Sequence, residues 1–446
     1  MALRTGSFRL LANRHYLTLF AARTLAMLAV AFTPVALAFG ILNLPGGSAT
    51  DLSTVLACQL GPAVLAVLFG GVVADRYSRA RLIALGEAAM GVGWLAMGGL
   101  LLTGSVQLAP LCAFAALVGV ASAVTYPALT GIIPDLVAED ELTEANAMLQ
   151  GAAATARLLG VVLGGAVVAF VGGGVALAAA GGGYLLSAVL VLLLPKASRT
   201  AGASASMLRQ LREGWGEFSS RQWLWVIVVA WGVMYMFFEA AIGVVGPVIA
   251  KLDLGGAMGW TIVLTGEAGG AIAGILVSMF WRPRRPIMVG CALALTSGLP
   301  GILLGLHWPL ALIVVAAVLM GFGFEMFSVY WLTTMQLEVP PESLSRVASY
   351  DAFGSLLLGP LGLVLAGPAT DAFGAHPLMV FCSLACVAVI GLALLSPGVR
   401  SVSPYHDDEP DGFALGEAPL AAGEGVWPQL PRSQAAPDPD AAGCGP

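Results

Sequence analysis

Long apolar runs alternate with short polar or Gly/Pro-rich breaks along most of the chain. Twelve of these runs reach about 18 residues or more, the length that an α-helix needs to cross the hydrocarbon core of a bilayer. They cover residues 16–42, 51–74, 81–103, 107–131, 146–170, 173–195, 222–249, 257–280, 286–306, 308–334, 345–370 and 374–396. This pattern predicts an all-α, polytopic membrane protein with twelve transmembrane helices.

Glycines mark the weak points of this division. Residues 172–174 are the narrow break between the fifth and sixth runs, and residues 181–183 lie inside the sixth run. Glycine lowers helix propensity, so we expect the sixth helix to be weakened there. The first run is longer than the ~7–15 apolar residues of a signal peptide, and we interpret it as the first span.

The longest polar loop divides the runs into six and six. It leads us to expect an N-terminal six-helix bundle (1–195), a cytoplasmic linker (196–221), a C-terminal six-helix bundle (222–397) and a disordered cytoplasmic tail (398–446). In each half, a proline segment after the fourth span leads into a Gly-rich fifth span. The two segments are Ile133-Pro134-Asp135 and Glu338-Val339-Pro340. This echo favours two pseudo-symmetric bundles related as parallel repeats.

Lys and Arg predict the orientation of the spans. With the N-terminus inside, the inner segments hold seventeen basic residues and the outer loops hold only Lys251. By the positive-inside rule, both termini are expected in the cytoplasm and the protein in the plasma (inner) membrane. The inner residues are Arg4, Arg9, Arg14, Arg76, Arg79, Arg81, Lys196, Arg199, Arg209, Arg212, Arg221, Arg282, Arg284, Arg285, Arg346, Arg400 and Arg432.

Composition restricts the class of protein further. Of the 446 residues, 58% are apolar and 10% charged, whereas a soluble domain carries about 25% charged residues. The lipid bilayer is therefore the expected surrounding, and without a basic patch interleaved with aromatics we expect no nucleic-acid partner. The sequence has no phosphate-binding loop of the type Gly-x-x-x-x-Gly-Lys-Ser/Thr, which disfavours ATP-driven transport.

The histidines give little support for an enzyme. His15, His307, His376 and His406 lie near span ends or in the tail, and we expect them to be too dispersed for a catalytic or metal site. A multispan lipid transferase would also need an acidic metal-binding cluster. We therefore predict no enzyme, no cofactor and no metal, and keep a membrane enzyme only as a remote alternative.

A charged loop between the second and third spans resembles a known family signature. It reads Gly70-Gly71-Val72-Val73-Ala74-Asp75-Arg76-Tyr77-Ser78-Arg79-Ala80-Arg81. From Gly71 onwards it is similar to the Gly-x-x-x-(Asp)-Arg-x-x-Arg-Arg pattern of the major facilitator superfamily. The resemblance covers about residues 8–396. It implies two rocking bundles, a small-molecule substrate and a protein that functions as a monomer.

Two further segments resemble one branch of this superfamily, the drug and siderophore exporters akin to macrolide-efflux and enterobactin-export proteins. They are Tyr126-Pro127-Ala128 … Ile133-Pro134-Asp135-Leu136-Val137 and Val339-Pro340-x-Glu342 … Arg346-Val347. The chain departs from the branch at Leu129, where a basic residue is common. It also lacks the Arg that proton antiporters of the superfamily often carry in span four, which leaves the coupling ion open.

The resemblance assigns a conformational latch to the signature loop. Gly71, Asp75, Arg76 and Arg79 are expected to close the cytoplasmic side against residues 345–351 at the start of span eleven. A carboxylate is stabilised at the positive N-terminal end of a helix, which suits Asp75 to this role. The alternative is a solvated turn whose arginines serve topology alone.

Charged residues inside spans are the candidates for ion coupling or substrate binding. Such a charge costs about 2.5–3.5 kcal/mol at the centre of a span, so it usually faces a cavity or a partner. The resemblance places spans one, seven and ten around the cavity, which favours Glu239 and Glu325 as proton or cation sites. Glu267 is a further candidate, and Arg157 could bind an anionic substrate or pair with a Glu. Structural ion pairs or snorkelling side chains remain the alternative reading, for Arg23 as well.

Aromatic, methionine and glycine patterns suggest a pocket and a gate. Residues 231–238 and 322–331 suit a broad apolar pocket, although lipid-facing packing explains them equally well. Gly160, Gly164 and Gly165 predict close packing of span five against span eight, a contact that matters for gating in exporters of the family.

The spans carry few polar groups, which favours a lipophilic cargo over a sugar or an acid. We therefore expect proton-coupled export of a lipophilic small molecule such as a drug, natural product or siderophore. An importer or facilitator of a small nutrient on the same fold is the alternative.

Overall fold

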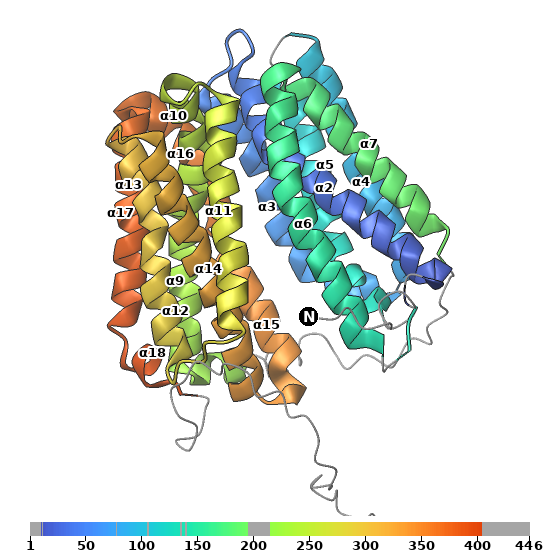
Figure 1. Ribbon diagram of the computed structural model, residues 1–446, viewed down its shortest axis with the longest axis vertical. Helices are drawn as coiled ribbons and strands as arrows, with labels where there is room; N and C mark the ends of the chain where they lie inside the picture. Colours follow the sequence, from blue (N-terminus) through green and yellow to red (C-terminus); the bar gives the residue numbers. More distant parts are fainter. Residues whose placement is uncertain are drawn as a thin grey trace, which may run out of the picture.

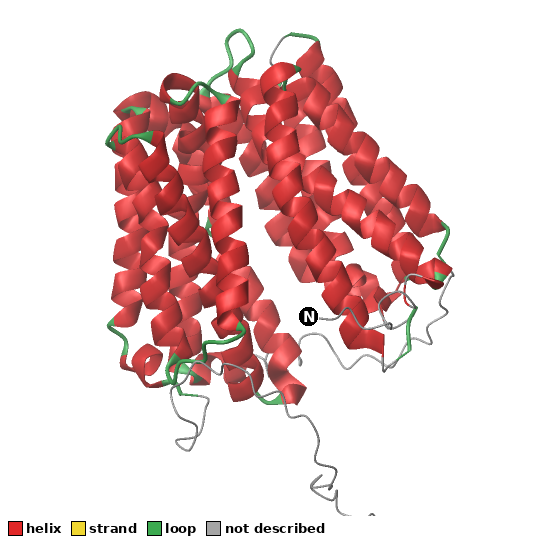
Figure 2. Cartoon of the chain, in the orientation of Figure 1, coloured by secondary structure: helices red, strands yellow, loops and turns green. Residues whose placement is uncertain are grey.

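The computed structural model describes residue 10 and residues 12–76, 78–104, 107–133, 136–138, 141–194 and 215–403. Within these ranges, twelve helical segments are long and apolar enough to cross a membrane, and each coincides with one predicted run. The all-α fold with twelve spans is thereby confirmed, and Figure 2 shows helices and loops throughout the described part of the chain.

Six helices form the N-terminal bundle. They are α2 (Arg14–Leu42), α3 (Ala49–Arg76), α4 (Arg79–Leu102), α5 (Leu108–Ile132), α6 (Leu142–Phe170) and α7 (Gly173–Leu192). Gly172, with φ of 106°, separates α6 from α7, so the narrow break is real. However, α7 continues unbroken through residues 181–183, contrary to our expectation. The reason is packing, because a Cβ added at Gly181 would lie 2.7 Å from the Gly91 carbonyl oxygen of α4.

The C-terminal bundle repeats the arrangement with more interruptions. Three of its spans are single helices: α11 (Ala257–Ser278), α14 (Leu310–Glu338) and α17 (Ala375–Leu394). The other three are interrupted: α9 (Gln222–Phe238) continues through the π-helix η3 (Glu239–Val245) into α10 (Gly246–Asp253), α12 (Pro286–Ala294) through the 3₁₀ turn η4 (Leu295–Gly298) into α13 (Leu299–Gly305), and α15 (Pro341–Leu356) is followed by α16 (Gly359–Phe373). The short α18 (Pro397–Ser401) follows α17. Pro247, Pro300 and Pro360 each lie in the first turn after an interruption. Proline lacks an N–H and fits the first turn of a helix, which explains why these spans restart there.

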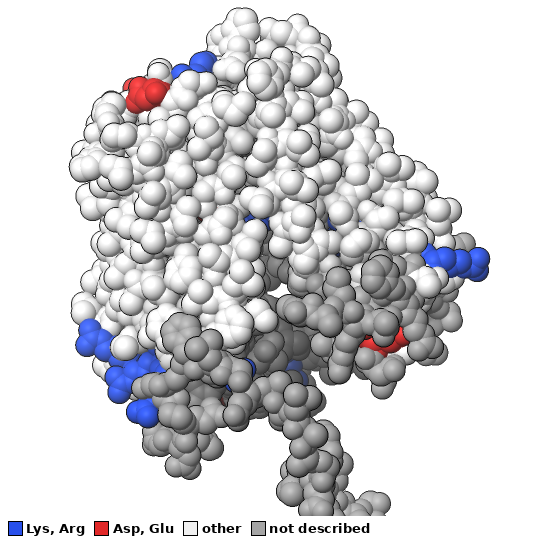
Figure 3. All heavy atoms as spheres, in the orientation of Figure 1, with Lys and Arg blue, Asp and Glu red and all other residues white. Residues whose placement is uncertain are grey.

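The two ends of the molecule differ in charge and in packing. The described arginines at helix ends, such as Arg81, Arg221, Arg285 and Arg400, lie at one end, which we call the arginine-rich end. The opposite end carries Lys251. Figure 3 shows blue side chains gathered toward the lower part of the visible face and a small charged group at the top.

Among the described residues, buried side chains join the two bundles toward the opposite end. One apolar cluster there contains Val35 and Leu52 from the first bundle together with Val245, Ile249 and Leu363 from the second. Toward the arginine-rich end, the apolar clusters of the two bundles are separate from each other. In Figure 1 the bundles lie close together near α10 and diverge toward α15. The described molecule is thus closed at the opposite end and splayed at the arginine-rich end.

The last residues of the expected linker pack on the C-terminal bundle. Residues 215–220 are helical, and the ring of Trp215 lies 5.7 Å from that of Phe218 and 5.6 Å from that of Tyr350 on α15. Phe218 also contacts Tyr350, at 5.7 Å. These rings anchor the chain just before span seven begins.

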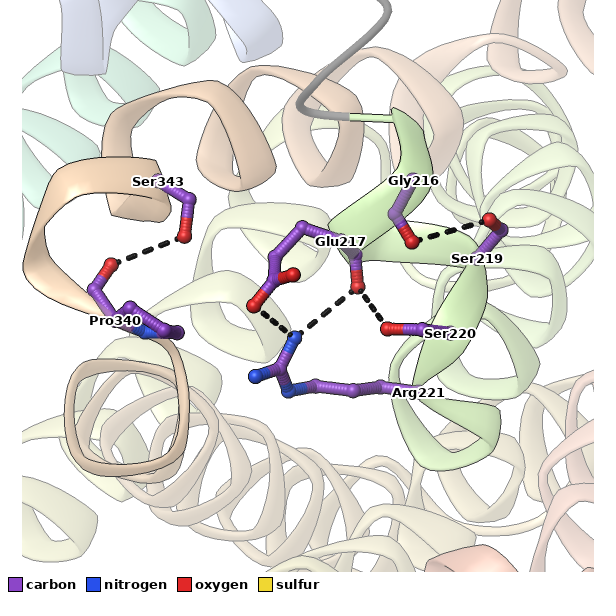
Figure 4. Close-up of polar contacts among 7 residues, drawn as sticks. All are labelled: Gly216, Glu217, Ser219, Ser220, Arg221, Pro340 and Ser343. Carbon is purple, nitrogen blue, oxygen red and sulfur yellow. Dashed lines mark hydrogen bonds and ion pairs between the residues drawn. The ribbon is translucent and has the colours of Figure 1, made fainter.

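Polar contacts complete this anchor, as Figure 4 shows. Glu217 and Arg221 form an i,i+4 ion pair of 2.7 Å, and Arg221 Nη1 also donates to the Glu217 carbonyl at 3.2 Å. In the neighbouring first turn of α15, Ser343 Oγ donates to the Pro340 carbonyl at 3.1 Å. Each of these contacts lies within its own segment, and the rings of Trp215 and Phe218 against Tyr350 join the two segments.

Candidate functional site

An aromatic cavity of about 330 Å³ lies inside the C-terminal bundle. Its wall comes from α9, α14 and α15, and consists of Ile227, Trp231, Met234, Tyr235, Phe238, Phe324, Phe327, Ser328, Trp331, Asp351 and Ser355. The two aromatic segments that the sequence left open between a pocket and lipid packing therefore both line this cavity. Spacing of one helical turn, as at 227, 231, 234, 235 and 238 of α9, directs these side chains to one face.

The rings in this wall are held in fixed positions. Trp231 and Phe327 are stacked with centroids 3.8 Å apart, and Phe238 meets Phe324 edge-on at 5.2 Å. Trp331 extends the stack from Phe327 at 6.0 Å. Such a wall offers flat apolar surface and negative ring faces to a ligand.

Asp351 is the single carboxylate among the described residues of this wall. Its Oδ2 accepts from Trp331 Nε1 at 3.0 Å, and its Oδ1 accepts from Ser355 Oγ at 3.2 Å. The sequence placed Asp351 in the partner region of the latch, whereas here it faces an aromatic pocket. An acid among aromatic rings can bind a lipophilic cation.

A charged cluster links the two bundles near the middle of the membrane. Arg157 of α6 lies with Nη2 3.6 Å from Glu267 Oε1 of α11, and it is close enough to Glu325 of α14 for their charges to interact. Arg157 and Glu325 each lie 15 residues (157 − 142 and 325 − 310) into helices of 29 residues. Of the two roles considered for Arg157, the geometry gives it a Glu partner.

Glu239 lies where span seven changes from α-helix to π-helix. Its carboxyl group lies beside the hydroxyl of Tyr235 one turn earlier. Leu56 of α3 and Leu363 of α16 lie beside the same spot, because a Cβ added at Gly243 would contact both of them and Glu239 Oε2. Glu239 thus faces the contact between the halves, and π-helical turns are frequent at functional sites.

Arg23 points into the N-terminal bundle. It interacts electrostatically with Glu87 of α4 and with Tyr184 of α7. Glu87 is only 1% exposed, and its Oε2 has no hydrogen-bond partner within the described part of the chain. Ser187, which donates to the Ala22 carbonyl at 2.8 Å, lies beside it. The charges of Arg23 and Glu87 therefore interact within one bundle without a direct ion pair, and the role of Arg23 stays a prediction.

The glycines of span five face two different neighbours. A Cβ added at Gly165 would lie 1.8 Å from Thr261 Oγ1 of α11, so this residue packs against span eight as expected. Gly160 and Gly164 instead lie against Ala31 and Phe32 of α2, at 2.5 and 2.9 Å. The expectation that all three face span eight is therefore wrong for two of them, because successive small residues at i,i+4 lie on one face and Gly165 on the next.

Two polar contacts close the opposite end of the molecule. Thr50 Oγ1 of α3 donates to Asp371 Oδ2 of α16 at 2.7 Å. Lys251 Nζ of α10 donates to the carbonyl of Leu42 at the end of α2. Each contact joins one bundle to the other. Together with the apolar cluster, they hold this end shut.

The expected latch falls largely outside what the structure describes. The side chains of Gly71, Asp75 and Arg76 are not among the described ones. Arg79 begins α4 directly after the capping position at Ser78. The helices α3 and α15 are in contact, and the assignment of the latch stays a prediction.

The structure corrects our view of the histidines. His307 and His376 were expected to be dispersed, yet their rings are stacked with centroids 4.0 Å apart. Asp253 lies beside both of them. No sequence pattern indicates this cluster, because the three residues are far apart in the chain.

Comparison with known proteins extends these observations. The model of the Major Facilitator Superfamily matches residues 18–362. The multidrug efflux pump Tap of Mycolicibacterium fortuitum is 25% identical over 371 residues, which is 80% of this chain and 89% of that protein. The pump of the same name from Mycobacterium tuberculosis (strain ATCC 25618 / H37Rv) is 30% identical over 161 residues, or 35% and 38% of the two chains.

Solved structures show the same fold. The nucleoside transporter NupG is similar with a TM-score of 0.67, 13% identity and coverage of 85% of this chain and 98% of that chain. A peptide transporter POT in complex with sulfate gives a TM-score of 0.70, also at 13% identity, over 88% and 96% of the two chains. These similarities concern the fold alone. The match to the family model confirms the expected family and excludes an enzyme: the chain is a multi-pass membrane transporter that belongs to the Major Facilitator Superfamily.

Proposed function

We propose that this transporter exports lipophilic small molecules, preferentially cationic ones, from the cytoplasm, and that the proton gradient drives it. The observation that carries the proposal is the aromatic cavity with Asp351 as the single carboxylate of its described wall. A volume of about 330 Å³ suits a drug-sized ligand or a large part of one. The similarity to multidrug efflux pumps supports export of such cargo.

The arginine-rich end is the cytoplasmic end in this proposal. Short loops rich in Arg remain inside during membrane insertion, and Lys251 is the only Lys or Arg among the described residues at the opposite end. The splayed arrangement would then admit cargo from the cytoplasm or the inner leaflet. Rocking of the two bundles against each other would release it on the outside.

Coupling to protons is assigned to the cluster of Arg157, Glu267 and Glu325. While Glu267 is ionised, its attraction to Arg157 holds α6 against α11. Protonation of Glu267 removes that attraction and lets the helices separate. The proton thereby favours one conformation over the other, which is what coupling requires.

Efflux of a fluorescent lipophilic cation such as ethidium from preloaded cells tests the proposal. Trp231→Ala removes the stacked ring from the cavity, and Trp225→Ala is the matched control because Trp225 lies on the same helix, 40% exposed, outside the cavity wall. We expect wild type and Trp225→Ala to extrude the dye, and Trp231→Ala to be roughly tenfold slower, since one aromatic contact is worth about 1–2 kcal/mol.

A proton uncoupler added to the same cells should abolish efflux by the wild type. Higher dye accumulation in cells that express the protein than in cells that do not would instead favour an importer on the same fold. Equal efflux by Trp231→Ala and Trp225→Ala would show that the cavity does not bind the cargo.

A further inference from the structure

Three side chains that could bind a metal meet at the opposite end of the C-terminal bundle. Asp253 is the last residue of α10, His307 lies in the loop between α13 and α14, and His376 is in the first turn of α17. His376 Nε2 lies 2.6 Å from Asp253 Oδ2, and His307 Nε2 lies 3.7 Å from the same oxygen. The three potential ligand atoms all lie within 4.8 Å of one another.

The backbone at His307 adopts an unusual conformation. Its φ of 59° is the only positive value among the described non-glycine residues. Glycine normally occupies such a left-handed position after a helix, because it has no Cβ to crowd the backbone. A histidine here therefore suggests that its side chain has a use, and it stacks the imidazole on His376 with an angle of 21° between the rings.

We propose that Asp253, His307 and His376 form a binding site for a divalent transition-metal ion, with Zn²⁺ the best match. Two imidazoles and one carboxylate are a common zinc-binding set, with Zn–N bonds of about 2.0–2.1 Å. Neighbouring ligand atoms in a tetrahedral site are then about 3.3 Å apart. The separations of 2.6 and 3.7 Å bracket that value. The exposed His307 ring must turn out of its stack on His376, because each imidazole binds a metal within its own ring plane. Water would complete the shell.

Zinc would replace the direct hydrogen bond between His376 and Asp253. It would tie the end of α10 to α17 and to the loop before α14. Lys251, two residues before Asp253, donates to the Leu42 carbonyl of the other bundle. A bound ion would therefore fix the segment that holds the closed end together, and would slow any transport cycle that must open this end.

Zinc titration of the purified full-length protein, with any affinity tag removed, tests the site by calorimetry. We expect one Zn²⁺ per wild-type chain, and at least tenfold weaker binding for His376→Gln and for Asp253→Asn. His307→Gly is the most informative variant, because it removes the imidazole while glycine accepts the left-handed backbone. His15→Gln, at the other end of the molecule, is the matched control and should bind as the wild type does.

The site would be overturned if His307→Gly and His376→Gln bound zinc as tightly as the wild type does. It would also be overturned if the wild type bound no zinc at millimolar concentration. The effect on transport rests on the proposed function and is measured separately, as inhibition of dye efflux by external Zn²⁺. We expect inhibition of the wild type and at least tenfold less sensitivity in His307→Gly. Zinc bound without inhibition would overturn the link to the closed end and leave the site itself standing.

Discussion

At the residue scale, the variant Asp351→Asn tests whether the cavity selects cationic cargo. Asp351→Asn keeps one oxygen that can accept from Trp331 Nε1 and offers an amide N–H that can donate to Ser355 Oγ, but it removes the negative charge from the cavity. We expect export of cationic cargo to fall about tenfold, the equivalent of about 1.4 kcal/mol, and export of a neutral lipophilic compound to change little. Paired efflux assays with both compounds measure the difference. Glu338→Gln, outside the cavity wall, should leave both rates unchanged; an equal loss for both cargoes in Asp351→Asn would argue against charge recognition.

The variant Glu267→Gln tests, at the same scale, whether this carboxyl group couples transport to protons. Glu267→Gln keeps the shape of the side chain but removes its attraction to Arg157 and its ability to exchange a proton. We expect concentrative efflux to be lost while downhill movement of cargo persists, because the helices can still separate. Transport into proteoliposomes with and without an imposed pH gradient distinguishes concentrative transport from downhill movement. If Glu267→Gln still responds fully to the gradient, the proton site lies elsewhere, and Glu239 or Glu325 becomes the better candidate.

Single residues show how far sequence reasoning reaches. The rarity of charges inside spans was enough to single out Arg157, Glu267 and Glu325, because a buried charge needs a reason. Their pairing was not predictable, since it depends on how two helices 110 residues apart in the chain (267 − 157) come together. The cluster of His307 and His376 was missed for the same reason. The available signal was topological, as both residues lie at the same end of neighbouring spans.

At the scale of helices, Gly165 tests the contact between the bundles. Gly165→Ala places a Cβ 1.8 Å from Thr261 Oγ1, so α6 and α11 must move apart. Overpacking of this kind typically costs about 1–3 kcal/mol. We expect a lower melting temperature and slower transport. Gly151→Ala on the same helix is the control, because nothing lies within 4 Å of its added Cβ, and helix propensity favours alanine there. Equal behaviour of the two variants would contradict the close contact.

Helices were predictable from the sequence, but their irregularities were not. Apolar length alone located every span, since a bilayer requires helices of that length. The π-helical turn at Glu239 leaves no trace in the apolar pattern, because that pattern reports the length of a span and not its backbone hydrogen bonds. The glycines at 181–183 misled us about α7, since their effect depends on a neighbouring helix that the sequence does not reveal.

At the scale of the whole molecule, the sequence predicted two halves but not their relative position. Composition, loop charge and the internal echo are the same whether the bundles open toward one side or the other. The two states of such a transporter differ by a few contacts between rigid halves, such as Thr50 with Asp371. Which end is closed therefore becomes visible only in the assembled structure.

If the closed end must open during transport, a cross-link across it should stop the transport cycle. Cysteines at Thr50→Cys and Asp371→Cys should form a disulfide readily under mild oxidation, because the two native side chains are hydrogen-bonded at 2.7 Å. A protein locked in this way can take up cargo from the arginine-rich end but cannot release it at the other. We expect efflux to stop on oxidation and to recover on reduction, with efflux by each single-cysteine variant insensitive to oxidation. The measurement is dye efflux before and after reduction, alongside a gel assay that reports the cross-link. Undiminished efflux in fully cross-linked protein would mean that this end does not open during transport, and alternating access between the two ends would have to be abandoned for this chain.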